Sequence, residues 1–291
     1  MEAVNTISGV FSTQEVRKVG TGTTSRKSIH KMFWYCLELE SGEDAGKVEV
    51  QPLNANYIPS GPKRCLDKEQ FLTEFSPEPE LYVSNVFPKI REMNKTIARA
   101  ERYRGNKEYY SAEMEFNNVL KVDEENVRAN FGLGLTYLER NEVDKAHNMF
   151  DRLIKLDAAF EQEHKHLFNE FGIQLRKNKM FKESMEYYKK ALEISDQDEN
   201  LYYNSARAAL ENNDPEQTVD LLLKGLQINP AMDESVRFLM WMISKNIIPG
   251  DKRNAVVLAL KAAKENAAAG NAASASPDAA AQESPAATPA P

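Results

Sequence analysis

The strongest constraint on the fold is a repeat of near-constant length in the middle of the chain. Residues 93–232 divide into four segments that align once residues 161–164 are set aside as an insertion: 93–126, 127–160, 165–198 and 199–232. Small residues recur at the eighth and the twentieth position of each segment, where two antiparallel helices must approach closely. Each helix pair alone leaves an apolar face uncovered, so the repeat predicts that successive pairs stack and form a core between neighbours.

Segment 127–160 carries the pattern most clearly. Leu133, Gly134 and Tyr137 fall on its first predicted helix, and Ala146 and Phe150 fall on its second. This pattern resembles the tetratricopeptide repeat (TPR), a helix-turn-helix unit of about 34 residues. The resemblance implies a mainly α fold, a right-handed helix-turn-helix solenoid. Its four units exceed the three or so that a repeat array needs for stability.

The end of the array is also readable from the sequence. Residues 233–267 continue with one more helix of the first type and an amphipathic helix that can cap the array. Residues 268–291 are mostly Ala, Ser and Pro and contain no large apolar side chain. Such a composition cannot bury enough surface to offset its ordering entropy, so it predicts a disordered tail.

The first ninety residues have a different periodicity. Alternating apolar and polar residues predict short strands within 15–19, 31–40 and 47–54, and 67–75 reads as a short amphipathic helix. Residues 1–90 are therefore expected to form a small β-rich or α+β module. The connection 76–88 runs straight into the first repeat helix, which favours a module docked on the array over one on a free linker.

The sequence VGTGTTSRKS (residues 19–28) is similar to a phosphate-binding loop. The second glycine of that motif is missing, and bulky residues stand where phosphate would need room. The sequence on either side reads as strands, whereas a phosphate-binding loop opens a helix. We therefore interpret 19–28 as the turn of a β-hairpin.

Composition restricts the remaining functions. A formal charge of -7 argues against a general nucleic-acid or anionic-membrane binder, and no window is apolar enough to span a membrane. Cys36 and Cys65 are too few and too widely spaced for a disulfide framework or a zinc site. His164 and His166 would point in nearly opposite directions on a helix, so no metal or cofactor is expected. These features predict a cytoplasmic protein.

No nucleophile can be placed beside a base, so the sequence favours a non-enzymatic binding protein. The resemblance implies that the first helices line a concave groove for a peptide or a partner helix. The matching positions in this chain are Arg128, Phe131, Leu135, His166, Asn169, Ile173, Asn200, Tyr203, Asn204, Arg207, Arg237 and Trp241. Residues 200–241 contribute Asn, Arg, Tyr and Trp, which suit peptide recognition best.

Some family members grip a chaperone's C-terminal carboxylate through Lys and Asn side chains on their first helices. This chain has Ile97 and Glu101 where the first Lys and Asn of that clamp would lie, which argues against chaperone-tail binding. The leading hypothesis is therefore an adaptor or scaffold for another protein partner.

Two alternatives stay open. One is a nucleotide- or nucleic-acid-binding protein acting through residues 17–35, where Arg17, Lys18, Arg26, Lys27 and Lys31 stand near Phe33, Trp34 and Tyr35. The other is self-association through an exposed edge of the module or of the solenoid.

Overall fold

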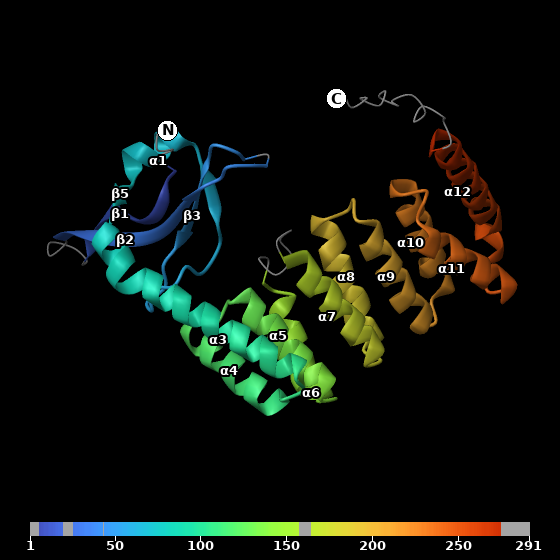
Figure 1. The fold of residues 1–291 in the computed structure, drawn as a ribbon, viewed down its shortest axis with the longest axis horizontal. Coiled ribbons are helices and arrows are strands. Elements are labelled where there is room, and N and C mark those ends of the chain that lie inside the picture. The colour runs from blue at the N-terminus through green and yellow to red at the C-terminus, as the bar shows by residue number, and fades with distance from the viewer. Residues whose placement is uncertain (1–5, 20–25, 43, 157–163, 275–291) are drawn as a thin grey trace, which may run out of the picture. The chain divides into compact units, whose positions relative to one another are not determined.

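The computed structural model describes residues 6–19, 26–42, 44–156 and 164–274 (Figure 1). The chain divides into two compact units, residues 1–178 (unit 1) and 179–291 (unit 2). The division falls between the two helices of the third predicted repeat. The domain boundaries predicted from the sequence, at 90, 232 and 267, stay predictions.

Unit 1 begins with an antiparallel sheet, which confirms the predicted β-rich module. Its strands lie in the order β4-β3-β2-β1-β5. Their bounds are β1 (Ser8–Val19), β2 (Arg26–Glu38), β3 (Val48–Pro52), β4 (Arg64–Leu66) and β5 (Ser76–Pro77). Helix α1 (Lys68–Glu74) contributes Phe71 to a small core with Cys36, Val48 and Val50. The helix and the sheet thus share one core.

The segment tested as a phosphate-binding loop joins two paired strands. β1 and β2 pair antiparallel as far as Val19 opposite Arg26. Residues 20–25, the centre of the expected hairpin turn, lie outside the described residues. The chain after them is strand β2, whereas a phosphate-binding loop opens a helix.

The aromatic residues of β2 take part in packing within the module. The indole N–H of Trp34 donates to Thr13 Oγ1 (2.9 Å), and the ring of Trp34 meets Phe75 edge-on at 6.0 Å. Tyr35 lies 6.3 Å from Tyr82. These contacts favour a structural role for the two rings, and no contact in the described part of the chain supports the nucleic-acid alternative.

A continuous helical run leads from the sheet into the repeats. It comprises α2 (Pro79–Leu81), a π-helical turn η2 (Tyr82–Val86) and α3 (Phe87–Gly105). In the π turn the N–H of Phe87 donates to the carbonyl of Tyr82, five residues earlier. Pro88 follows and has no N–H to donate, so the wider turn sits where the regular ladder is interrupted.

Hydrogen bonds fix the β module to the first repeat within unit 1. The side-chain amides of Asn54 and Asn56 both donate to the carbonyl of Val122 (3.0 and 2.9 Å), at the end of α4 (Tyr109–Val122). Ser60 Oγ donates to Asp123 Oδ1 (2.7 Å). The module is therefore docked, as the connection 76–88 suggested.

The helices that follow confirm the repeat. They are α5 (Val127–Glu139), α6 (Val143–Leu153) and α7 (Lys165–Lys177) in unit 1, then α8 (Phe181–Ile194), α9 (Glu199–Glu211), α10 (Pro215–Ile228), α11 (Asp233–Ser244) and α12 (Arg253–Ser274) in unit 2. The residues expected at the close helix approaches are buried: Ala100, Ala112, Gly134, Ala146, Gly172, Ser184, Ala206 and Thr218.

Each first helix ends in the same turn. A residue with positive φ follows the helix at Lys107, Asn141, Lys179, Asn213 and Asn246. At Asn141 the chain makes the paired bonds of a Schellman motif: the N–H of Glu142 donates to the carbonyl of Tyr137, and that of Asn141 to Leu138. Asn tolerates this conformation and recurs at three of the five turns, whereas Lys occupies the other two.

The C-terminal helix differs in length from the prediction. α12 continues to Ser274, past residue 267 where the capping helix was expected to end. Alanine favours a helix, which explains the extension into the Ala-rich segment. The rest of the predicted disordered tail, 275–291, lies outside the described residues. None of the described helices is long and apolar enough to cross a lipid bilayer.

Candidate functional site

Helices α9 and α11 in unit 2 bring four of the predicted groove residues together. Tyr203 and Arg207 lie one turn apart on α9, and Arg237 and Trp241 lie one turn apart on α11, so each pair shares a helix face. The start of α9 is fixed by Asp198, whose carboxylate accepts from the N–H of Asn200 (3.0 Å).

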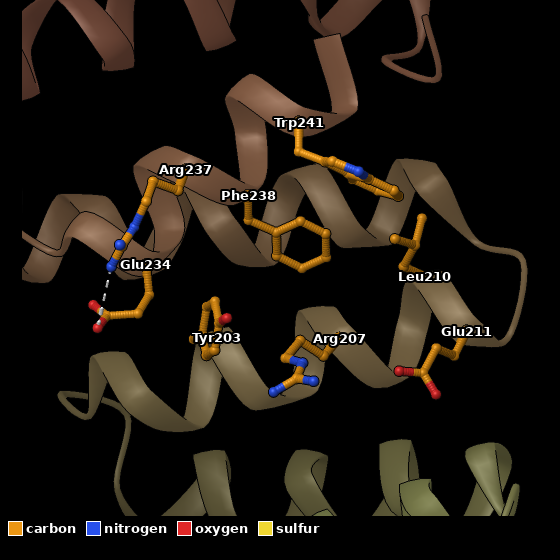
Figure 2. A pocket seen from close by; sticks show the side chains of 8 residues that line it. All are labelled: Tyr203, Arg207, Leu210, Glu211, Glu234, Arg237, Phe238 and Trp241. Atoms are coloured by element: carbon orange, nitrogen blue, oxygen red, sulfur yellow. Dashed lines mark ion pairs between the residues drawn. The ribbon is translucent and has the colours of Figure 1, made fainter. Parts of the chain in front are cut away.

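Between the two helices is an open cavity of about 570 Å³, which we call the α9–α11 cleft. In Figure 2 the side chains of both helices face the space between them. The cleft is lined by Tyr203, Arg207, Leu210, Glu211, Glu234, Arg237, Phe238 and Trp241.

Aromatic rings form the apolar part of the cleft. The rings of Tyr203 and Phe238 meet edge-on at 6.1 Å, and those of Phe238 and Trp241 lie 6.0 Å apart. Trp241 nevertheless stays 45% exposed, whereas Leu239 and Met242 beside it on α11 are buried. A large ring held against its neighbours with nearly half its surface open is a suitable contact for a partner.

The two arginines of the cleft differ in their surroundings. Arg237 forms an ion pair with Glu234 (3.7 Å), the dashed line in Figure 2. The guanidinium of Arg207 lies 5.9 Å from the centre of the Tyr203 ring, and it forms no ion pair with any residue that the structure describes. Arg207 is thus the cleft cation that can accept a carboxylate without first breaking an ion pair.

The two asparagines predicted for this surface do not line the cleft. Asn200 is exposed at the first turn of α9, and Asn204, one turn further along the helix, is half-buried. Both lie on the same helix face as the cleft residues, at intervals of three or four. They can reach only a ligand that extends beyond the cavity.

The predicted groove residues of unit 1 occupy different environments. The Arg128 guanidinium forms an ion pair with Glu101 and donates to both oxygens of the Glu101 carboxylate. Phe131 is fully buried and meets Phe171 edge-on at 5.7 Å. This burial corrects the assignment of Phe131 to the groove: its ring fills the core between α5 and α7. Leu135, on the next turn of α5, is also fully buried.

Further ion pairs cover the first helices of unit 1. Arg104 Nη1 on α3 lies 2.8 Å from Glu139 on α5 and 3.1 Å from Glu170 on α7. On α7, Asn169 and Ile173 are half-buried and His166 is exposed. The two positions that the chaperone-tail clamp would use are occupied by other contacts: Ile97 is buried, and Glu101 forms an ion pair with Arg128.

Four residues of the cleft were not predicted from the sequence: Leu210, Glu211, Glu234 and Phe238. Phe238 had a signal, since it occupies the repeat position of Asn204, which the sequence assigned to the groove. The acidic residues read only as solvent-exposed helix charges. Among the described residues, no group of three or more His, Cys, Asp or Glu is placed to hold a metal ion.

Comparison with known proteins agrees with the repeat. Residues 174–198 match the tetratricopeptide repeat family model. Together with the helix pairs and their recurring turn, this match supports a tetratricopeptide-repeat protein. Such proteins generally serve as non-catalytic scaffolds for protein interaction, no enzyme family is indicated, and the fold supports a scaffold role here.

Several solved structures share the helical repeat at low similarity. A crystal structure of MamA is 15% identical and covers 66% of this chain and 98% of its own, with a TM-score of 0.45. MamA of Desulfovibrio magneticus RS-1 is 13% identical, with coverages of 61% and 96% and a TM-score of 0.43. PilF of Pseudomonas aeruginosa is 15% identical, with coverages of 55% and 71% and a TM-score of 0.42. These likenesses carry no argument about function. The comparison with curated proteins gives no match.

Proposed function

We propose that the chain is a non-enzymatic interaction scaffold that holds a peptide or helix of a protein partner in the α9–α11 cleft. The observation that carries the proposal is that one cleft is lined both by a partly exposed Trp241 and by an Arg207 that has no ion pair among the described residues. A cytoplasmic location remains a prediction from the sequence.

The chemistry of the cleft suggests what the partner presents. Tyr203, Phe238 and Trp241 offer rigid apolar surface, which suits an aliphatic or aromatic side chain. Arg207 can donate two parallel hydrogen bonds to a carboxylate. We therefore expect the bound segment to carry a large apolar residue and a carboxylate close together.

Truncating the cleft residues tests this function. A phage-displayed random peptide library is selected against the full chain, and the selected peptides are then titrated against variants. Asn204→Ala/Arg207→Ala and Trp241→Ala should each weaken binding about ten-fold or more, because central aromatic and Arg contacts dominate such interfaces. Lys224 is an exposed cation on α10, outside the cleft. Lys224→Ala is therefore the matched control and should bind like the wild type.

The same variants are then used as baits for proteins of the native lysate. A partner that is captured by the wild type and Lys224→Ala, and lost from both cleft variants, supports the proposal. Peptides that bind all four proteins equally would place the binding surface outside the cleft and contradict it.

A further inference from the structure

The α9–α11 cleft contains a second arginine whose charge is already in use. Arg207 and Glu211 line the cleft from α9, and Glu234 and Arg237 line it from α11. Arg207 is the cation that the proposed function assigns to the carboxylate of the partner. Because Arg237 lies in the same cleft, the contacts that hold it decide whether the cleft can take a second carboxylate.

Two polar contacts hold Arg237 on its own helix. Its Nη2 lies 3.7 Å from Glu234 Oε1, and its Nε donates to the backbone carbonyl of Asp233 (3.3 Å). Both groups lie about one turn before Arg237 in α11, which is the spacing at which helix side chains meet. Figure 2 shows the Arg237 side chain turned toward Glu234. The guanidinium is therefore held along α11 and not across the cleft toward α9.

The start of α11 does not by itself account for Glu234. A carboxylate in the first turn of a helix is stabilised by the helix dipole, and Asp233 already supplies one. Glu234 differs from Asp233 because its carboxylate pairs with Arg237 and because its side chain lines the cleft. The side chains of Glu234 and Arg237 are 54% and 70% exposed, so a ligand can reach the ion pair.

This ion pair penalises a ligand with two carboxylates. A second carboxylate would have to displace Glu234 from Arg237, and the two acids would then repel each other. A ligand with one carboxylate binds Arg207 and leaves the pair intact. We propose that Glu234 is a specificity-determining residue, which restricts the cleft to partner segments that carry a single carboxylate beside the large apolar residue. This inference rests on the proposed function and narrows its class of partner.

Matched peptides test the role of Glu234. A library-selected peptide that carries one Glu is titrated against the full chain, beside copies in which each neutral polar residue in turn is replaced by a second Glu. The wild type should bind no copy more tightly than the parent peptide. Glu234→Gln should bind at least one copy about two- to five-fold more tightly than the wild type does, because an exposed ion pair no longer has to be broken.

Two further variants show whether this gain comes from Arg237. The gain should disappear in Glu234→Gln/Arg237→Ala. Asp233→Asn is the matched control, because it removes a charge from the same helix turn outside the cleft, and it should bind every peptide like the wild type. A gain that survives the loss of Arg237, an equal gain in Asp233→Asn, or no gain in Glu234→Gln would overturn the inference.

The parent peptide separates this inference from the proposed function. If Asn204→Ala/Arg207→Ala and Trp241→Ala weaken its binding while Glu234→Gln shows no gain, the cleft binds the peptide and only the role of Glu234 is wrong. If neither cleft variant weakens its binding, the proposed function is wrong and the role of Glu234 is overturned with it.

Discussion

The first helices of unit 1 and those of unit 2 occupy the same repeat positions but present different surfaces. In unit 1, Arg104 and Arg128 are each paired with acidic residues of neighbouring first helices. In unit 2, Arg207 lies near the ring of Tyr203 in a cleft that is also lined by the partly exposed Trp241. The same scaffold thus satisfies its own charges at one place and leaves a cation and an aromatic surface available at another.

The difference can be followed at a single repeat position. Phe131 on α5 and Tyr203 on α9 are equivalent, yet Phe131 is fully buried and Tyr203 only half-buried. Gly132 follows Phe131, and a Cβ there would lie 2.2 Å from Phe116 Cζ. The glycine lets α4 and α5 close tightly in unit 1, whereas Asn204 takes the same place in unit 2.

The difference in burial between Phe131 and Tyr203 predicts the largest effect on stability, and it falls on the core of unit 1. Phe131→Ala should cost about 3–5 kcal/mol of stability, because it removes a fully buried ring, whereas Tyr203→Ala should cost about 1 kcal/mol. Urea unfolding followed by fluorescence measures both. Trp34 reports on unit 1 in a Trp241→Phe background, and Trp241 reports on unit 2 in a Trp34→Phe background. Equal losses would show that the two positions are equally buried.

The glycine position gives the next largest contrast. Gly132→Ala should destabilise unit 1 by about 1–3 kcal/mol, since the new methyl group overlaps the buried Phe116 ring. Asn204→Ala should change stability by about 0.5 kcal/mol or less. The same unfolding assay measures both changes, and a neutral Gly132→Ala would mean that the ring can move aside.

Acid should also separate the two units. The pKa of Glu38 lies below its ordinary value because Lys68 donates a hydrogen bond to it, and Lys31 lowers the pKa of Glu78 in the same way. Burial raises the pKa of Glu113, but hydrogen bonds from Arg140 and Tyr137 outweigh it and leave that pKa lowered as well. Among the described residues these are the carboxyl groups with lowered pKa, and all three belong to unit 1.

A carboxyl group whose pKa is lowered by folding stabilises the protein above its unfolded pKa of about 4.3, and this contribution is lost as the pH falls through the folded pKa. Urea midpoints of unit 1 should therefore fall more than those of unit 2 between pH 5 and pH 3. The two single-tryptophan backgrounds measure this directly. A parallel fall in both units would contradict the assignment of these groups.

The smallest effect is expected from the ion pairs of unit 1. Removing the pair with Glu101→Gln should cost about 0.2–1 kcal/mol, and less at high salt, because both side chains are partly exposed. Unfolding in low and in high salt measures it. A salt-independent loss above this range would mean that the pair is more shielded from solvent than its exposure indicates.

Much of the fold could be predicted because small and large residues recur at fixed positions of the repeat. Ala112 and Phe116, or Thr218 and Leu222, are spaced by one turn on a helix, and this spacing alone places them in the core. The length of α12 was missed, because alanine suits both a helix and a disordered segment.

The site was predictable only in part. Tyr203, Arg207, Arg237 and Trp241, which the repeat register assigned to the groove, line one cleft, and their role in binding stays a prediction. The register could not distinguish Phe131 from Tyr203. Phe131 packs against Phe171, whereas Tyr203 packs against Phe238, and both of these rings come from other helices. The ion pair of Arg128 likewise depends on Glu101, which lies one repeat earlier.

The most direct test of the central claim compares the two surfaces in one experiment. A photo-crosslinking benzophenone amino acid is introduced either at position 204 on α9 or at position 128 on α5, and each full-length protein is irradiated with a peptide selected from the library. We predict adducts from position 204 and none from position 128. Adducts from position 128 alone would contradict the account and assign binding to the first helices of unit 1.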